Sequence, residues 1–165
     1  MIFIGDAHQR LREDYLRILR FFRFNAWYAK GPLDPHGLAA CADLVAGLDQ
    51  LSVERVWKET KKLLEAPDPR AAWEGMKAIE DAGRALPELS NEARLDALCT
   101  LQADLMLPFD AMTRVAAAVP DQESGKSLAR RLKLSNEERD RLVLALGDDV
   151  KITSYMSLRE MRRAI

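Results

Sequence analysis

The sequence has 165 residues, of which 48% are hydrophobic and 31% charged, and its net charge is -1. This length suits a single domain with a sizeable core, and the balanced charge excludes a chain that is polybasic throughout. No apolar stretch approaches the roughly 20 residues that cross a bilayer, and the apolar start lacks the basic residues of a secretory signal. We therefore expect a cytoplasmic protein.

The composition predicts an all-α fold, because Leu, Ala, Glu and Arg are frequent and there are only 8 glycines and 7 prolines. The only cysteines, Cys41 and Cys99, lie in apolar helical patterns and are interpreted as buried, reduced thiols. The two histidines and two cysteines do not form a cluster with the short spacing of metal ligands, so we predict no metal site in this chain.

The first residues predict a short strand followed by a long helix. Residues 2–4 (Ile-Phe-Ile) are typical of a strand, and no later segment offers it a partner. Asp6 then caps a helix that is expected to run without interruption to about residue 29 and to stop at Gly31-Pro32. A strand without a partner suggests that the chain begins within something larger.

The remaining chain predicts a series of shorter helices. They are expected at residues 35–47, 53–66, 70–83, 91–105, 109–119, 126–134, 136–147 and 158–165, with residues 121–125 as a loop. Their caps are Asp34, Ser52, Asp68, Ser90, Ser135 and Ser157, the last two in capping boxes. The result is an elongated array of about eight to nine helices in one unit, because no linker is long enough to separate two domains.

The sequence has none of the common catalytic motifs. Gly-rich phosphate loops, Gly-x-Ser-x-Gly, His-Glu-x-x-His and Cys-x-x-Cys are missing. The acidic pairs Glu137-Glu138 and Asp148-Asp149 lie at helix starts or in loops, where solvated acids are ordinary. The sequence therefore predicts no catalytic centre and no catalytic metal in this chain.

The first long helix carries an unusual group of charges: Glu13, Asp14, Arg17 and Arg20. On a continuous helix Asp14 and Arg17 share a face, and ordinary intrahelical ion pairs are one interpretation. The other is nucleobase recognition, because a carboxylate beside a guanidinium presents an acceptor next to a donor. That edge complements cytosine and adenine, which have an amino group beside a ring acceptor, and it leaves polar groups unpaired against uracil and guanine.

Several segments resemble one enzyme family. The stretch IFIGDAHQRLREDYLRILRFFRFNAWY resembles the head–neck junction of bacterial class II tRNA nucleotidyltransferases, the CCA-adding enzymes, and of related poly(A) polymerases. REDYLRILRFFRF resembles their Glu-Asp-x-x-Arg motif, LSVERVWKETKKLL resembles the Glu-Arg-x-x-x-Glu helix that follows, and ARRLKLSNEERDRL is similar to a segment of their helical body. The resemblance extends from Ile2 to about Leu146.

The resemblance implies a division of roles along the chain. Residues 1–66 would form the neck, in which Asp14 and Arg17 read the base of CTP or ATP while Glu13 and Arg20 orient them. Glu54, Arg55 and Glu59 match the second motif and would support the neck helix, although solvated ion pairs are the simpler interpretation. Residues 67–165 would form the body and tail, which hold the RNA.

A basic cluster gives the RNA-binding role its clearest candidates. Lys126, Arg130, Arg131 and Lys133 fall within eight residues without an acid between them. Such a cluster suits contacts to RNA phosphates, and it is also compatible with a plain solvated helix face.

The family's catalytic head has no counterpart in this sequence. In the family the head carries the Gly-rich nucleotide loop and the carboxylates that bind Mg²⁺, so we expect Mg²⁺ to bind there and this chain alone to be inactive. The predicted function is the nucleotide-selecting, tRNA-binding portion of a CCA-adding enzyme or poly(A) polymerase. The expected partners are the 3′ end of tRNA or another RNA, CTP or ATP, and the head domain. The alternative is a non-catalytic helical RNA-binding or adaptor module.

Overall fold

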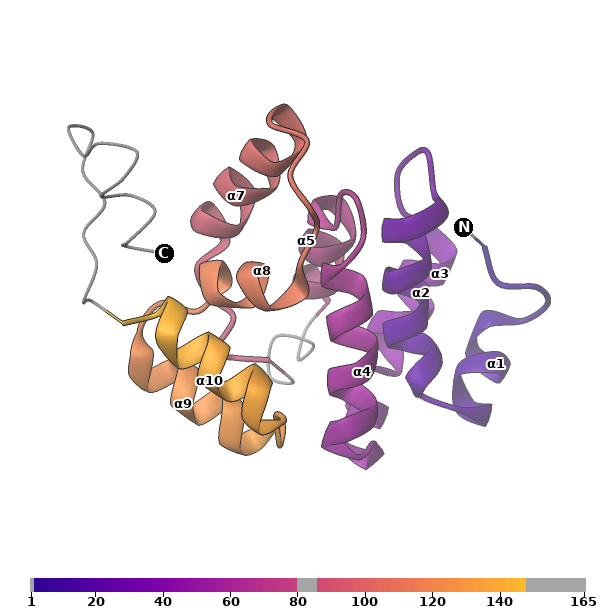
Figure 1. The fold of residues 1–165 in the computed structure, drawn as a ribbon. Coiled ribbons are helices and arrows are strands. Elements are labelled where there is room, and N and C mark those ends of the chain that lie inside the picture. Colours follow the sequence, from indigo (N-terminus) through magenta and orange to yellow (C-terminus); the bar gives the residue numbers. More distant parts are fainter. Residues whose placement is uncertain (1, 80–85, 148–165) are drawn as a thin grey trace.

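The computed structural model describes residues 2–79 and 86–147, and within these ranges the chain is all-α, as predicted (Figure 1). The helices are α1 (Ala7–Glu13), α2 (Leu16–Tyr28), α3 (Pro35–Asp43), the 3₁₀ helix η1 (Val45–Gln50), α4 (Val53–Leu64), α5 (Arg70–Ala78), α7 (Glu92–Asp104), α8 (Ala111–Ala118), α9 (Gln122–Arg131) and α10 (Asn136–Ala145). The helix predicted at residues 158–165 and its cap Ser157 lie outside the described residues.

The strand expected at residues 2–4 does not form. A strand needs a neighbour for its backbone hydrogen bonds, and no described residue is in a strand. The segment instead lies against α2, where the Phe3 ring stacks on Phe21 with centroids 5.5 Å apart.

The long first helix was predicted as one element and is in fact two. Asp14 ends α1 in an extended conformation, with φ -159° and ψ 105°, and α2 begins two residues later. The Asp14 carboxylate accepts the Leu16 backbone N–H at 3.1 Å. Aspartate competes in this way with helical hydrogen bonds, and this local bond stabilises the break. The prediction of an uninterrupted helix to residue 29 was therefore wrong.

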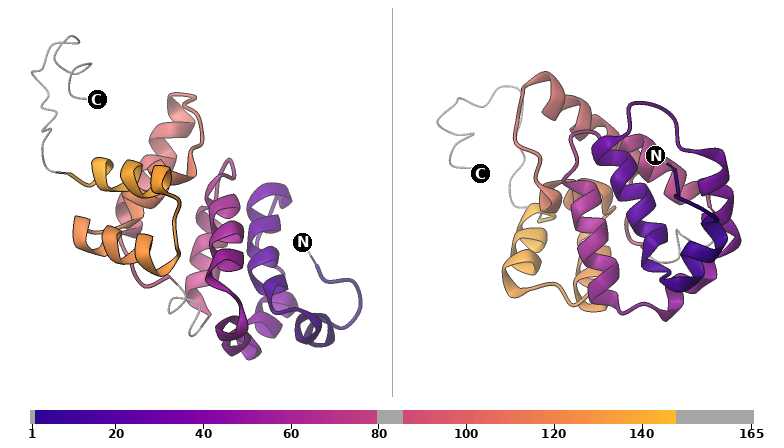
Figure 2. Two further views of the ribbon diagram at one scale, coloured as in Figure 1. Left: turned by 60° about the horizontal axis from the view of Figure 1, so that its bottom comes forward. Right: turned by 90° about the vertical axis from the view of Figure 1, so that its right-hand side faces the viewer.

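Helix α4 stands in the middle of the molecule, between the N-terminal helices and α8–α10 (Figures 1 and 2). Helix α2 packs on α4 and α5, α4 packs on α8, and α8 in turn contacts α7 and α10. One continuous core joins these layers, and its fully buried members include Leu11, Ile18, Phe22, Leu63, Leu64, Val115, Leu128 and Leu142.

The predicted caps Asp6, Asp34 and Ser135 are confirmed. Ser52 occupies the N-cap of α4 without a side-chain capping bond, and the N-cap of α5 is Pro69 instead of Asp68. The Asp34 carboxylate accepts the Gly37 N–H at 2.7 Å, and Ser135 with Glu138 forms the predicted capping box. The cap of α7 is Asn91 instead of Ser90. Residues 121–125 are not a loop, because Asp121 caps α9 and the rest of the segment is helical.

A buried arginine joins α8 to the end of α4. Arg114 is 0% exposed. Its Nη1 donates to the carbonyls of Leu64, at 2.6 Å, and Ala66, its Nη2 to that of Pro67 at 3.3 Å, and its Nε to Gln102 Oε1 at 2.8 Å. The final carbonyls of a helix have no partner within the helix, so this guanidinium supplies hydrogen bonds that α4 cannot make itself.

The cysteines are buried free thiols, as predicted. Burial raises the pKa of Cys41 to about 12, so its reactive thiolate form is scarce at neutral pH. None of the helices in residues 2–79 and 86–147 combines the length and the hydropathy of a bilayer-spanning segment.

Candidate functional site

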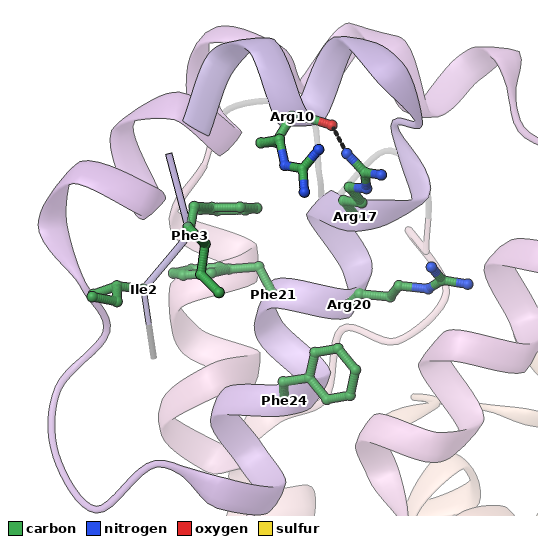
Figure 3. A pocket seen from close by; sticks show the side chains of 8 residues that line it. Ile2, Phe3, Arg10, Arg17, Arg20, Phe21 and Phe24 are labelled. Carbon is green, nitrogen blue, oxygen red and sulfur yellow. Dashed lines mark hydrogen bonds between the residues drawn. The ribbon is translucent and has the colours of Figure 1, made fainter. Parts of the chain in front are cut away.

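An open cavity of about 300 Å³ lies where α1 and the start of α2 meet the N-terminal segment (Figure 3). Arg10, Arg17 and Arg20 line it together with the rings of Phe21 and Phe24. The N-terminal residues 2–4 close one side. The lining thus combines guanidinium donors with flat aromatic surfaces and includes no acidic side chain.

Two of these arginines share one carboxylate. Arg17 Nη1 donates to the Arg10 carbonyl at 2.6 Å (Figure 3). It also donates to the Glu13 carboxylate, and Arg10 lies 3.2 Å from the same carboxylate. The hydrogen bond from Arg17 lowers the pKa of Glu13. Because two guanidinium groups face one carboxylate, positive charge remains at the cavity wall. The predicted neighbourhood of Glu13 and Arg17 is confirmed.

Asp14 is placed differently from the prediction. Since it lies at the break between α1 and α2, it does not share a continuous helical face with Arg17. Its carboxylate is 3.0 Å from Arg55 Nη2 on α4. Burial raises the pKa of Asp14, but the hydrogen bonds from the Leu16 amide and from Arg55 outweigh this effect and lower it. The second carboxylate oxygen of Asp14, Oδ2, accepts one hydrogen bond, of 3.2 Å, from Arg55 Nη2.

We expect the Asp14–Arg55 pair to make stability depend on acid pH. Because the pKa of Asp14 is lowered in the folded state, its ionised carboxylate stabilises the fold at pH values above the unfolded-state pKa of about 3.9. This stabilisation is lost as the pH falls through the folded-state pKa. Asp14→Asn should lower the free energy of unfolding at pH 7 by at most about 1 kcal/mol, because Arg55 is largely solvated. Urea titrations at several pH values should show the difference shrinking below about pH 4. The exposed Asp49→Asn is the control, and a difference independent of pH would contradict the assignment.

A buried carboxylate on α4 lies behind the next two arginines. The Glu59 side chain is 6% exposed and sits 3.6 Å from Arg20 and 3.2 Å from Arg23. The contact to Arg23 has the distance of an ion pair without the alignment of a hydrogen bond. Glu59 therefore anchors Arg20 by charge while the guanidinium of Arg20, which is 42% exposed, still reaches the cavity.

The two sequence motifs thus meet in space. Arg55 of the second motif pairs with Asp14 of the first, and Glu59 pairs with Arg20. Sequence reasoning missed Arg10 and Phe24, which line the cavity although neither belongs to a motif. Phe24 could have been predicted from its spacing, because it is four residues from Arg20 on α2 and therefore lies on the same face of the helix.

The predicted basic cluster is divided between solvent and ion pairs. Arg131 binds Glu88 with two hydrogen bonds of 2.6 and 2.9 Å, and Lys133 lies 2.7 Å from Glu54 on α4. Arg130 projects into solvent with a side chain 76% exposed, 3.8 Å from Glu123. Lys126 contacts only Gln122 among the described side chains. The acids that neutralise Arg131 and Lys133 come from distant parts of the sequence.

Metal-binding side chains do not gather in the parts of the chain that the structure describes. Within them, no group of three or more His, Cys, Asp or Glu could hold an ion. The charged chemistry of the site therefore comes from arginines and their paired carboxylates.

Comparison with known proteins gives a family match for part of the chain. Residues 32–92 match the family model described as "Probable RNA and SrmB- binding site of polymerase A". This segment includes α4 and therefore the second motif, which contacts the candidate site.

Curated relatives extend the match to the rest of the chain. The CCA-adding enzyme of Streptococcus sanguinis is 35% identical over 97% of this chain, and the mitochondrial CCA tRNA nucleotidyltransferase 1 of Danio rerio is 34% identical over 84%. The human mitochondrial enzyme is 50% identical over 38% of the chain. The chain covers 39%, 32% and 15% of the lengths of these three relatives, respectively. Over most of its length this chain is therefore similar to one part of the CCA-adding enzymes, and it spans less than two fifths of their length.

Proposed function

We propose that this chain selects the incoming nucleotide and holds the RNA 3′ end for a nucleotidyltransferase that extends tRNA. The reaction itself, with its Mg²⁺, is assigned to a catalytic head domain. The observation that carries the proposal is the cavity lined by Arg10, Arg17, Arg20, Phe21 and Phe24; Asp14 does not line it and lies at the break between α1 and α2.

The side chains of the cavity offer the interactions that a nucleobase needs. The ring of Phe24 gives a flat surface for stacking. Arg17 uses Nη1 for its contacts to Arg10 and Glu13, which leaves its other guanidinium donors for a ring acceptor. Asp14 Oδ2 would accept an amino proton of cytosine or adenine. Because Asp14 is not on the same helix as Arg17, the base would lie across the break between α1 and α2.

The RNA would be held mainly by charge. Lys126 and Arg130 are the exposed cations of α9, and contacts to phosphates need no particular base. Arg131 and Lys133 would have to exchange Glu88 and Glu54 for phosphate. We therefore place the stronger RNA contacts at Lys126 and Arg130.

The names of the relatives favour CCA addition over poly(A) addition. The streptococcal and vertebrate relatives that match most of this chain are CCA-adding enzymes by name, whereas the polymerase A description belongs to the family model. CTP and ATP are the nucleotides that we propose as ligands.

Nucleotide selectivity tests the proposal. In this chain joined to the head domain of a CCA-adding relative, Arg17→Ala should relax discrimination against UTP and GTP roughly 5- to 100-fold, since it removes a hydrogen bond worth about 1–3 kcal/mol. Incorporation of all four nucleotides into tRNA lacking its terminal CCA provides the measurement. Asp14→Ala should act in the same direction with an added loss of stability, because it also releases Arg55.

Arg12→Ala is the matched control, because Arg12 is an exposed arginine of α1 that does not line the cavity. It should leave selectivity and melting temperature unchanged. If Arg17→Ala melts far lower and keeps its selectivity for C and A, the arginine is structural. If the joined protein binds RNA and transfers no nucleotide, a non-catalytic RNA-binding module is the better assignment.

A further inference from the structure

A second open pocket of about 300 Å³ lies at the far end of α2. It is lined by Arg23, Phe24, Trp27, Tyr28, Lys62 and Glu65. Trp27 is 41% exposed and Tyr28 is 71% exposed, whereas the other tryptophans, Trp57 and Trp73, are 7% and 3% exposed. Two large aromatic rings thus remain in solvent beside a cavity.

The rings are held in place and are not loose surface side chains. Trp27 Nε1 donates to the Lys62 carbonyl at 2.7 Å, which fixes the indole against α4. The Tyr28 ring lies 6.4 Å from Trp27 and 6.1 Å from Phe24, centroid to centroid. The Arg23 guanidinium lies 4.2 Å above the Phe24 ring. These contacts hold the rings of Trp27 and Tyr28 as a preformed pair of exposed aromatic surfaces, here called the Trp27–Tyr28 step.

The charge around the step favours an anion. Helix α2 carries Arg17, Arg20 and Arg23 and no acidic residue. At the pocket, Lys62 and Arg23 stand against Glu65, and Arg23 is also close to Glu59. The charges at the pocket itself nearly balance, and the positive charge lies toward Arg20, Arg17 and Arg10.

The two pockets are neighbours on one helix. Phe24 lines both of them. Arg20 and Trp27 are seven positions apart, which is about 10 Å along a helix that rises about 1.5 Å per residue. This exceeds the spacing of about 3.4 Å between stacked bases, so bases bound in the two pockets would not stack directly on one another. Linked nucleotides of one strand could place a base in each pocket.

We propose that the Trp27–Tyr28 step binds a nucleobase of a single-stranded RNA end, next to the nucleotide in the Arg10–Arg17–Arg20 cavity. This proposal rests on the proposed function, because it assigns the strand beside the selected nucleotide. Single-stranded nucleic acids are held by aromatic stacking together with positive charge along the backbone, and both are found along α2.

Trp27 itself can report binding, because it is the exposed tryptophan of the three. Titration of the chain with a short single-stranded oligocytidylate should quench its tryptophan fluorescence. The same oligocytidylate in a duplex with oligoguanylate, and CMP at equal nucleotide concentration, should quench much less. Equal quenching by CMP would overturn the proposal in favour of a site for free nucleotides.

Variants separate stacking from general surface charge. Trp27→Ala and Tyr28→Ala should weaken oligocytidylate binding, measured by anisotropy of labelled RNA, roughly 5- to 100-fold, as expected for one stacked base worth about 1–3 kcal/mol. Tyr28→Phe keeps the ring and should retain the wild-type affinity. Met106→Ala removes an exposed apolar side chain elsewhere and should change nothing.

Failure of this inference can be distinguished experimentally from failure of the proposed function. In the protein joined to a head domain, Trp27→Ala should raise the KM for the tRNA primer and leave the preference for CTP and ATP over UTP and GTP intact. Unchanged RNA affinity in folded Trp27→Ala, beside relaxed selectivity in Arg17→Ala, would refute this inference alone. Melting curves confirm that each variant is folded.

Discussion

Replacing Arg114 with methionine is expected to lower the free energy of unfolding by about 3–5 kcal/mol, the range for removing one member of a buried polar network. Arg114 is 0% exposed and gives hydrogen bonds to the carbonyls of Leu64, Ala66 and Pro67 and to Gln102. Methionine fills the space of the aliphatic part of arginine, so the change removes mainly the guanidinium with its hydrogen bonds and its packing. Each carbonyl that remains buried without a donor adds to the cost.

Arg114→Lys should recover only part of this loss. A single ammonium group cannot copy the planar fork that reaches carbonyls and the Gln102 amide together. Urea denaturation of the wild type and both variants gives the comparison, and Arg94→Met is the control. Arg94 is an exposed arginine with one bond, of 3.2 Å, to the Ala116 carbonyl. Equal stability of Arg114→Met and Arg94→Met would contradict the role of Arg114.

The second large effect is expected at Glu59. Glu59→Ala removes a carboxylate that is 6% exposed and leaves Arg23, itself 14% exposed, without its anion. A loss of about 2–3 kcal/mol is expected, below the 3–5 kcal/mol of fully buried pairs because Arg20 is 42% exposed. Glu59→Gln should cost less, since the amide keeps the shape of the side chain and a polar oxygen near Arg20 and Arg23.

Thermal and urea unfolding measure the change, and the exposed Glu74→Ala on α5 is the control. Double-mutant cycles with Arg20→Ala and Arg23→Ala divide the effect between the two partners. A coupling near zero for both arginines would show that the loss comes from packing of the Glu59 side chain.

The helices and caps were predictable because they depend on a few neighbouring residues. Asp34 with Pro35, and Ser135 with Glu138, form their caps from contacts within one turn. The break at Asp14 was missed, because the carboxylate also pairs with Arg55, which lies 41 positions later. Local sequence patterns do not reveal a contact between residues so far apart in the chain, so they could not predict that this contact outweighs helix propensity.

The candidate site was predictable in its charges and not in its geometry. Glu13 and Arg17 are neighbours on the chain and in space. Arg131 and Lys133 looked like free cations, yet their partners Glu88 and Glu54 are 43 and 79 positions away. The sequence alone does not single out Arg114, since its acceptors belong to the end of α4 and to α7.

The central position of α4 sets a rule for building hybrids of this chain with its relatives. Its adjacent residues Glu54 and Arg55 form ion pairs on opposite sides of the helix, with Lys133 and Asp14 respectively. In its last turn, Lys61 forms a further ion pair with Glu138 on α10. A crossover placed after α5 would therefore exchange α9 and α10 while leaving Glu54 and Lys61, the partners of Lys133 and Glu138, behind. Hybrids that inherit residues 54 and 61 together with the C-terminal helices keep these pairs matched.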